Sequence, residues 1–432
     1  MDGDVYTRGS TQGLSEKYDE LATALVPPKC MPPGGDKLRF NGTNWLCVCE
    51  PYWSSETCET PPPWSQQQKL TNDDGNDYDN FGHAVSLSGD YAVVGLTGTG
   101  GPGSSYVGNA YVFTRTGTVW TKERNLTSSD RTSEDGFGSA VSISGAYAVV
   151  GAPYGQHSWT PSAAYVFIRS ETTWTEQQKL QSLGLSDRFG SSVSISGDYV
   201  AVGAPNSNSQ RGNAYVFVRS GTQWTQQQKL TADDGQSYDY FGSSVSISGD
   251  YIVVGARGTN SNAGSAYVFV RSGTSWTEQQ KLNVTTGQSQ DNFGYSVSIS
   301  GDYIVVGAQG YLSSKGSAYV FVRDGTQWTH QQQLVASDGE TGDYFGYSVS
   351  ISGAYVAVGA RYDDSSRGST YVFLRSQTEW NEQQKVTVSD GAGADFFGSS
   401  VSISEDGYAL VGATGDDDDG YESGSAYVFA LT

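Results

Sequence analysis

A sevenfold repeat runs through most of the chain and constrains its fold more than any other feature. Each copy starts with a Phe-Gly pair, at Phe81, Phe137, Phe189, Phe241, Phe293, Phe345 and Phe397. The first interval is 56 residues and the other five are all 52. A Tyr-Val-Phe segment and a Trp that opens a polar segment recur in the same phase. Repeats of this length indicate a protein in which each copy packs only against its neighbours.

One copy reads as four strands whose polarity rises along the chain. The expected strands are Ser243–Ser248, Tyr251–Ala256, Ala266–Arg271 and Trp276–Leu282. Gly249 and Asp250 form a two-residue hairpin turn between the first two. Small side chains first, a wholly apolar run second and a polar strand last are typical of a propeller blade, whose inner strand is crowded and whose outer strand meets water. The repeat therefore predicts an all-β fold, a seven-bladed β-propeller of four-stranded antiparallel blades.

The two ends of the repeat region complete each other. The last copy stops at Thr432 without a fourth strand, whereas Trp64–Leu70 is a fourth strand with no copy before it. We expect Trp64–Leu70 to pair with Ala426–Leu431 and close the ring, so that the propeller covers residues 64–432. An open stack of repeats is the alternative, and it leaves both ends incomplete.

The motif Phe-Gly followed by Val-Gly-Ala-Pro, intact at Gly151–Pro153 and Gly203–Pro205, resembles the FG-GAP repeat. That resemblance implies the seven-bladed propeller of integrin α subunits and of related secreted and microbial surface proteins. The last motif position changes here to Arg257, Gln309, Arg361 and Thr414. Members of the family often carry a calcium loop between the first two strands. Two turn residues cannot supply the six or more oxygens that Ca²⁺ requires, so we expect neither these calcium sites nor another cofactor.

All four cysteines lie in one short segment, which we expect to be a small disulfide-bonded module over residues 30–60. Cys47 and Cys49 followed by Cys58 resemble the C-terminal half of an epidermal-growth-factor-like module. The resemblance implies the pairs Cys49–Cys58 and Cys30–Cys47. A zinc site is the rival interpretation, but Cys-x-Cys lacks the two-residue spacing of paired zinc ligands.

The first 29 residues form a tail in front of this module. Leu14, Tyr18, Leu21 and Leu25 lie at helical spacing, which suits a short oligomerising helix or a frayed tail equally. Pro61–Pro63 follows the module as a stiff spacer.

The net charge of −21 and the pI of about 4.4 argue against a nucleic-acid partner, because an acidic surface repels phosphate. No apolar run is long enough to span a membrane. Three sequons, at Asn41, Asn125 and Asn283, suit a glycoprotein, and the clustered cysteines suit an oxidising compartment. We therefore expect an extracellular or cell-surface protein.

The repeat loses its symmetry in the connections between the second and third strands of blades 7, 1 and 2, which are longer than in the other blades. They carry aromatic residues beside carboxylates, which suits binding of a glycan or a protein. The candidate ligand-binding residues are Tyr106, Tyr154, His157, Trp159, Tyr421 and the acidic run Asp416, Asp417, Asp418 and Asp419. Tolerance of loop tips to insertion is the alternative explanation. The acidic run suggests a solvated loop tip, with weak Ca²⁺ binding as an alternative.

A carboxylate also precedes every Phe-Gly pair by two residues, at Asp79, Asp135, Asp187, Asp239, Asp291, Asp343 and Asp395. Asp fixes loops by accepting hydrogen bonds from nearby backbone amides, so a structural role is favoured over a ring of ligand sites.

No pattern of catalytic residues stands out, and His83 and His330 fall in different blades. We expect a non-enzymatic adhesion or recognition protein that binds a partner through blades 7, 1 and 2. The alternatives are a structural protein that polymerises or coats a surface or filament, and a carbohydrate-binding lectin. The expected partners are accordingly a protein or glycan ligand, or a second copy of the chain.

Overall fold

A computed structural model of the chain describes residues 62–72, 77–98, 108–130, 135–154, 161–182, 184, 187–284 and 287–432. It also describes the backbone of β1 (Lys37–Phe40) and β2 (Trp45–Val48), which pair antiparallel. The chain divides into two units, Met1–Pro63 with Thr432, and Trp64–Leu431. The expected helix over residues 14–25 lies outside the described residues, and so do the cysteine side chains of the two expected disulfides.

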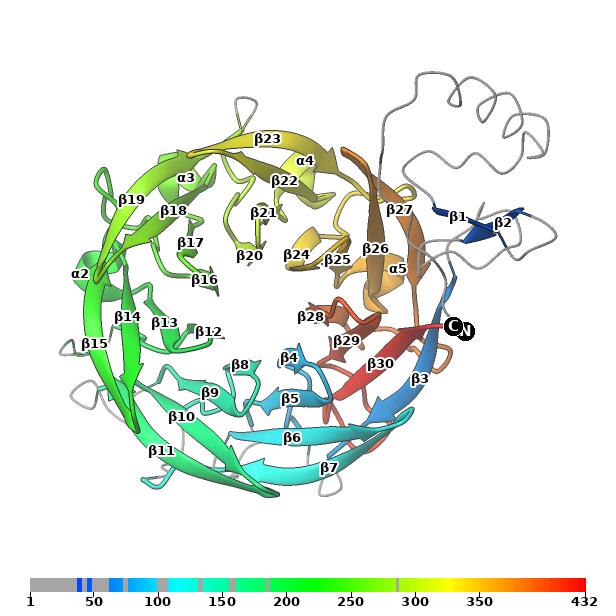
Figure 1. The fold of residues 1–432 in the computed structure, drawn as a ribbon, viewed down its shortest axis with the longest axis horizontal. Helices are drawn as coiled ribbons and strands as arrows, with labels where there is room; N and C mark the ends of the chain where they lie inside the picture. Colours follow the sequence, from blue (N-terminus) through cyan, green and yellow to red (C-terminus); the bar gives the residue numbers. More distant parts are fainter. Residues whose placement is uncertain are drawn as a thin grey trace, which may run out of the picture. The chain divides into compact units, whose positions relative to one another are not determined.

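The second unit is a ring of seven four-stranded antiparallel sheets, which confirms the predicted propeller (Figure 1). The innermost strands are β4 (Ala84–Ser88), β8 (Ala140–Ser144), β12 (Ser192–Ser196), β16 (Ser244–Ser248), β20 (Ser296–Ser300), β24 (Phe345–Ser352) and β28 (Phe397–Ile403). The second strands are β5 (Tyr91–Leu96), β9 (Tyr147–Ala152), β13 (Tyr199–Ala204), β17 (Tyr251–Ala256), β21 (Tyr303–Ala308), β25 (Tyr355–Ala360) and β29 (Tyr408–Ala413). The third strands are β6 (Asn109–Thr116), β10 (Ala163–Ser170), β14 (Asn213–Ser220), β18 (Ser265–Ser272), β22 (Ser317–Asp324), β26 (Ser369–Ser376) and β30 (Ser425–Leu431). The outer strands are β7 (Val119–Leu126), β11 (Thr173–Gln181), β15 (Gln223–Leu230), β19 (Ser275–Leu282), β23 (Gln327–Leu334), β27 (Glu379–Val386) and β3 (Trp64–Leu70).

The seventh blade is built from both ends of this unit. The outer strand β3 pairs antiparallel with β30, with Trp64 opposite Leu431 and Leu70 opposite Ala426. The side chain of Gln384 in the preceding blade brackets Trp64, accepting from its backbone N–H at 2.8 Å and donating to its carbonyl at 2.9 Å. Because β3 is the first propeller strand in the chain and β30 the last, their pairing joins the ends of the ring.

The core lies between neighbouring blades, and the repeated motif explains how the blades approach. Phe241 is fully buried and meets Tyr267 edge-on at a centroid distance of 5.5 Å. The two motif glycines bring adjacent backbones together, since a Cβ on Gly255 would lie only 2.1 Å from the carbonyl oxygen of Gly294 in the next blade. No larger residue fits at this contact, which accounts for the glycine of each Val-Gly segment.

The innermost strands form a closed ladder around the axis. In each strand a serine hydroxyl accepts a hydrogen bond, 3.0 to 3.1 Å long, from a backbone N–H of the next innermost strand. The acceptors are Ser86, Ser142, Ser194, Ser246, Ser298, Ser350 and Ser402. The recurrent serines are therefore structural links between blades.

Four connections between second and third strands contain a short turn that the sequence did not predict. These turns are α2 (Ser207–Gln210), α3 (Thr259–Asn262), α4 (Tyr311–Ser314) and α5 (Asp363–Ser366). In each, three consecutive residues adopt positive φ, as Asn208, Ser209 and Gln210 do in α2. None of these residues is glycine, and the Asn, Asp and Ser residues found there are common in turns of many kinds, so the sequence does not specify this conformation.

Candidate functional site

The antiparallel blades give the propeller two different faces. The hairpin turns within each blade lie on one face, which we call the turn face. The connections between second and third strands and the crossovers between blades lie on the other, which we call the loop face. The two kinds of loop are hydrogen-bonded there, since the N–H of Tyr240 in a crossover donates to the carbonyl of Gln210 at 2.9 Å.

The structure describes part of the aromatic set predicted on the longer loops. Tyr106, His157 and Trp159 lie outside the described residues. Tyr154 is 46% exposed and Tyr421 is 56% exposed. The Tyr421 ring meets Tyr78 edge-on at 5.1 Å, and the Tyr154 ring lies 5.3 Å from the guanidinium of Arg188. Both described tyrosines remain candidates for ligand contact.

The acidic run Asp416–Asp419 is tied to the seam of the ring. Asp416 is only 3% exposed and accepts a hydrogen bond of 2.5 Å from the Tyr427 hydroxyl. Lys69 of β3 lies 2.9 Å from Asp416 and 2.5 Å from Asp418. Burial lowers the pKa of Lys69, but hydrogen bonds to Asp418 and Asp416 outweigh it and leave the pKa raised, so the ammonium group is charged. A calcium ion would have to compete with Lys69 for these carboxylates, and no cluster of metal-binding side chains occurs among the described residues.

The repeated carboxylates hold their own loops in place. Asp239 accepts a hydrogen bond of 2.7 Å from the N–H of Gln236, and Asp135 accepts one of 3.0 Å from the N–H of Phe137. Similar bonds occur at Asp187, Asp291, Asp343 and Asp395. Burial raises the pKa of Asp395 to about 6, with further contributions from Asp416 and its neighbours. At Asp79 the contact is a hydrogen bond of 3.4 Å donated by the Asn72 amide.

Two sequons lie on the described surface. Asn125 is exposed on the outer strand β7, and Asn283 is exposed just after β19. Asn41 lies outside the described residues. The exposed positions leave room for a glycan at Asn125 and Asn283.

Two groups of arginines on opposite faces differ in their partners. Outside these groups, Arg375 on the turn face donates to the Tyr303 hydroxyl, and Arg367 on the loop face pairs with Asp364. On the turn face, Arg219, Arg271 and Arg323 each pair with the aspartate of a hairpin turn, at Asp198, Asp250 and Asp302. Arg115 and Arg169 also have carboxylate partners, Asp90 and Glu123, at 2.6 and 2.9 Å.

The loop face carries three arginines of a different kind, Arg188, Arg257 and Arg361, which we call the loop-face arginines. Among the described residues, no carboxylate lies within 4.0 Å of any of them. Arg257 lies over the ring of Tyr240 at 4.8 Å, and Arg361 lies over the ring of Tyr347 at 4.7 Å. A guanidinium stacked in this way keeps its N–H edge available for a planar anion.

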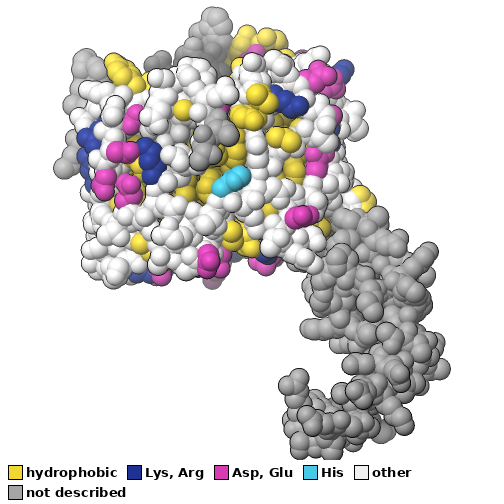
Figure 2. Space-filling view, turned by 90° about the horizontal axis from the view of Figure 1, so that it is seen from above, with side chains coloured by type: hydrophobic (Ala, Val, Ile, Leu, Met, Phe, Trp, Pro, Cys, Tyr) yellow, Lys and Arg dark blue, Asp and Glu magenta, His cyan; other side chains and the backbone are white. Residues whose placement is uncertain are grey.

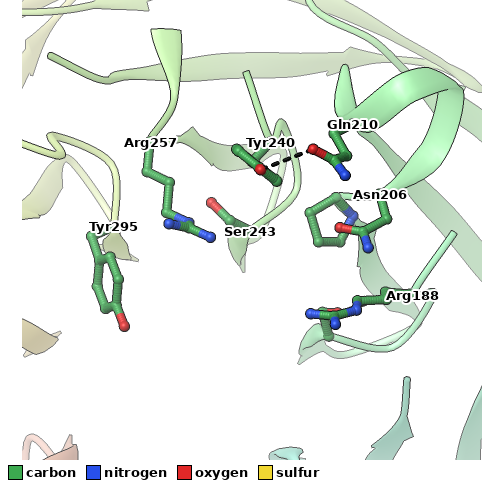
Figure 3. Close-up of a pocket in the computed structure, with 9 residues that line it drawn as sticks. Arg188, Asn206, Gln210, Tyr240, Ser243, Arg257 and Tyr295 are labelled. Atoms are coloured by element: carbon green, nitrogen blue, oxygen red, sulfur yellow. Dashed lines mark hydrogen bonds between the residues drawn. The ribbon is translucent and has the colours of Figure 1, made fainter. Parts of the chain in front are cut away.

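Two of the loop-face arginines border one hollow. It has a volume of about 470 Å³ and is lined by Arg188, Ser191, Pro205, Asn206, Gln210, Tyr240, Ser243, Arg257 and Tyr295. Figure 3 shows the guanidinium groups of Arg188 and Arg257 on two sides of the same space. The Tyr240 hydroxyl donates to the Gln210 side-chain carbonyl at 2.9 Å, which holds both at its edge. A hollow of this size suits a small polar ligand.

Tyrosine contacts continue on the loop face from the hollow to Arg361. The Tyr295 and Tyr347 rings lie 5.1 Å apart, and Tyr347 accepts a hydrogen bond of 2.7 Å from Arg361. His83 is exposed to solvent, and the surrounding protein together with the charge of Arg361 lowers the pKa of its imidazole.

The sequence carried a signal for two of these arginines. Arg257 and Arg361 replace the proline that ends the Gly-Ala-Pro motif, a change visible in the repeat. The sequence does not reveal which arginines lack a carboxylate partner, because that depends on neighbouring blades.

Seven copies of the sequence profile described as FG-GAP repeat match the chain. They cover residues 64–113, 120–167, 174–217, 224–269, 276–321, 328–373 and 380–429. The chain belongs to the FG-GAP repeat family. Each FG-GAP match begins at an outer strand and ends in a third strand. A blade begins with its innermost strand, so each match starts one strand earlier than a blade. The first match therefore starts with β3, which is the outer strand of the seventh blade.

Solved structures with a similar fold include two distant proteins. The first is Sqt1 from Chaetomium thermophilum, with 14% identity, a TM-score of 0.50, and coverage of 82% of this chain and 83% of that chain. The second is the periplasmic gluconolactonase PpgL of Pseudomonas aeruginosa, with 15% identity, a TM-score of 0.49, and coverage of 72% of this chain and 86% of that chain. No curated protein matches the chain in sequence. At these identities, the structural likeness concerns the fold alone.

The rim of the FG-GAP propeller carries charged side chains of both signs (Figure 2). Figure 2 views the ring from its rim, where basic and acidic side chains lie next to one another. Outer-strand lysines contribute to this pattern, since Lys281 lies 2.6 Å from Asp234 and Lys385 lies 2.6 Å from Asp338. In the described part of the chain, no helix has the length and apolar character needed to cross a membrane.

Proposed function

We propose that this chain is an extracellular or cell-surface recognition protein without enzymatic activity, which binds its partner through the loop face of the propeller. The observation that carries the proposal is the contrast between the two sets of arginines. Five of the six arginines that stack on the turn face have carboxylate partners, whereas the loop-face arginines have none among the described residues, and two of them, Arg188 and Arg257, border a hollow.

The longer loops of blades 7, 1 and 2 belong to the same binding surface in this proposal. Tyr154 of blade 2 is exposed and lies over Arg188 of blade 3, so the aromatic loops and the arginines are adjacent. Exposed aromatic residues beside arginines are common where proteins bind their partners. Tyr154 is thus the point at which the two candidate regions meet.

A non-enzymatic role is supported by how the potentially reactive side chains are used. Inner-strand serines such as Ser246 accept hydrogen bonds from the neighbouring blade. His83 is influenced by the positive charge of Arg361, which disfavours its protonation. An extracellular location is supported by the exposed sequons at Asn125 and Asn283 and by the clustered cysteines.

The test compares two matched double variants of the full chain. Arg257→Gln with Arg361→Gln alters the loop face, and Arg271→Gln with Arg323→Gln removes the same charge from the turn face. Both are assayed for binding to native cell surfaces and to immobilised glycans and matrix proteins. We expect the loop-face variant to lose binding and the turn-face variant to keep it, and the reverse pattern would contradict the proposal.

A further inference from the structure

The hollow between Arg188 and Arg257 combines three kinds of ligand contact. Its first feature is positive charge inside a chain whose net charge is −21. Arg188 stacks on Tyr154 and Arg257 on Tyr240, which holds the guanidinium groups without neutralising them. Two restrained guanidinium groups at one hollow are suited to an anionic group with planar or tetrahedral oxygens, such as a carboxylate or a sulfate.

The second feature is a set of uncharged polar groups with spare hydrogen-bonding capacity. Gln210 accepts from Tyr240 through its carbonyl oxygen, and no described group bonds to its NH₂ group or to the Asn206 side chain. Ser191 and Ser243 already donate to backbone carbonyls, so their oxygens remain as acceptors. Amide and hydroxyl groups of this kind match the alternating donors and acceptors of sugar hydroxyls.

The third feature is a small apolar surface supplied by Pro205 and the Tyr295 ring, which also line the hollow. A sugar ring has one comparatively apolar C–H face that packs against such surfaces. A volume of about 470 Å³ fits one or two sugar units, and an extended peptide would need a longer groove with backbone partners.

We propose that this hollow binds an acidic sugar, whose carboxylate or sulfate lies between Arg188 and Arg257 and whose hydroxyls contact Asn206 and Gln210. The inference rests on the proposed function, because it assigns a ligand class to the loop face. It predicts a preference for acidic over neutral sugars that falls as salt concentration rises.

The experiment is calorimetric titration of the full chain with defined probes. The probes are a glucuronate disaccharide, a sulfated galactose disaccharide, the corresponding neutral disaccharides and a short polyglutamate peptide. We expect an acidic disaccharide to bind at least about tenfold more tightly than its neutral counterpart, since hydrogen bonds to charged groups contribute this much. The two acidic probes distinguish carboxylate from sulfate as the group that is recognised.

Arginine variants test whether the acidic sugar binds at this hollow. Arg257→Gln and Arg188→Gln should each weaken the acidic sugar by about tenfold or more, and Arg257→Lys should fall between Gln and wild type because it keeps charge but not the planar donor pair. Arg271→Gln on the turn face is the matched control and should leave affinity within about twofold. Unfolding curves of all variants establish that each is folded.

Three outcomes would overturn the inference. The first is equal binding of acidic and neutral disaccharides. The second is binding of polyglutamate through these arginines without binding of sugars, which would leave the proposed function standing. The third is acidic-sugar binding that Arg271→Gln abolishes and Arg257→Gln does not, which would contradict both the inference and the loop-face proposal.

Discussion

The arginines of the two faces share the same packing but differ in their partners. Arg271 on the turn face lies over Tyr199 at 4.8 Å, and Arg257 on the loop face lies over Tyr240 at the same distance. Arg271 also pairs with Asp250, whereas no described carboxylate pairs with Arg257. Stacking therefore does not distinguish the two groups, and the carboxylate does. The paired arginines link neighbouring parts of the ring, and we propose that Arg188 and Arg257, which lack a described carboxylate partner, bind the ligand.

Lys69 tests this rule most strongly, because it is a loop-face cation that does have carboxylate partners. Replacing it with Met leaves the buried Asp416 without its cation, and we expect a loss of about 3 kcal/mol in the free energy of unfolding, measured in urea. The double variant Lys69→Met, Asp416→Asn should recover part of the loss, since it removes the unpaired charge. A loss below about 1 kcal/mol would show that this cluster does not stabilise the seam.

Two carboxylates, Asp395 and Asp234, should change the stability of the fold with pH in opposite directions. The pKa of Asp395 is raised by burial to about 6, so between about pH 4 and pH 6 the folded chain holds a proton that the unfolded chain releases. The stability of the wild type relative to Asp395→Asn should therefore fall by an amount on the order of 2 kcal/mol as pH rises through this window. Urea unfolding at several pH values measures the difference.

Asp234 provides the control with the opposite sign. Burial raises its pKa, but hydrogen bonds from Lys281 and Tyr267 outweigh that effect and leave the pKa lowered. The stability that Asp234 contributes should be present above its ordinary pKa of 3.8 and lost as pH falls below it. Equal slopes for the Asp395→Asn and Asp234→Asn variants would contradict the assignment of these two environments.

The two arginine groups should also differ, by a smaller amount, in their contribution to the free energy of unfolding. Arg271→Gln removes a partly exposed ion pair and a stacked contact, and we expect a loss of about 1 kcal/mol in unfolding free energy. Arg257→Gln removes only ring contacts, with Tyr240 and Tyr295, and the change should stay within about 0.5 kcal/mol. If Arg257→Gln proved the more destabilising, its role would be structural.

The ring could be predicted from the sequence because the turn residues and the strand pattern of each repeat indicate the same blade. The two-residue turn at Gly249 and Asp250 sets the register in which Ser248 lies opposite Tyr251, and the expected strand Tyr251–Ala256 is observed with the same bounds. The repeat also marked Arg257 as a departure from proline. Strand pattern and turn chemistry are local properties, so they can be read from the chain itself.

The candidate site was less predictable because it depends on contacts between blades. Arg188 and Arg257 are 69 positions apart and meet at one hollow only when blades 3 and 4 pack against each other. The left-handed turn at Asn208 and Ser209, in the connection between β13 and β14, contains no glycine that would have predicted it. The missing carboxylate beside Arg257 can be recognised only when the neighbouring blades are in place.

Side-chain NMR of the arginine guanidinium groups tests the central claim most directly. The full chain, labelled at arginine nitrogens and assigned with Arg→Lys variants, is titrated with the glucuronate disaccharide at constant ionic strength. We expect shifts in the resonances of Arg188 and Arg257, with those of Arg219, Arg271 and Arg323 unchanged. Shifts confined to the turn-face arginines, or none in either group, would contradict the claim.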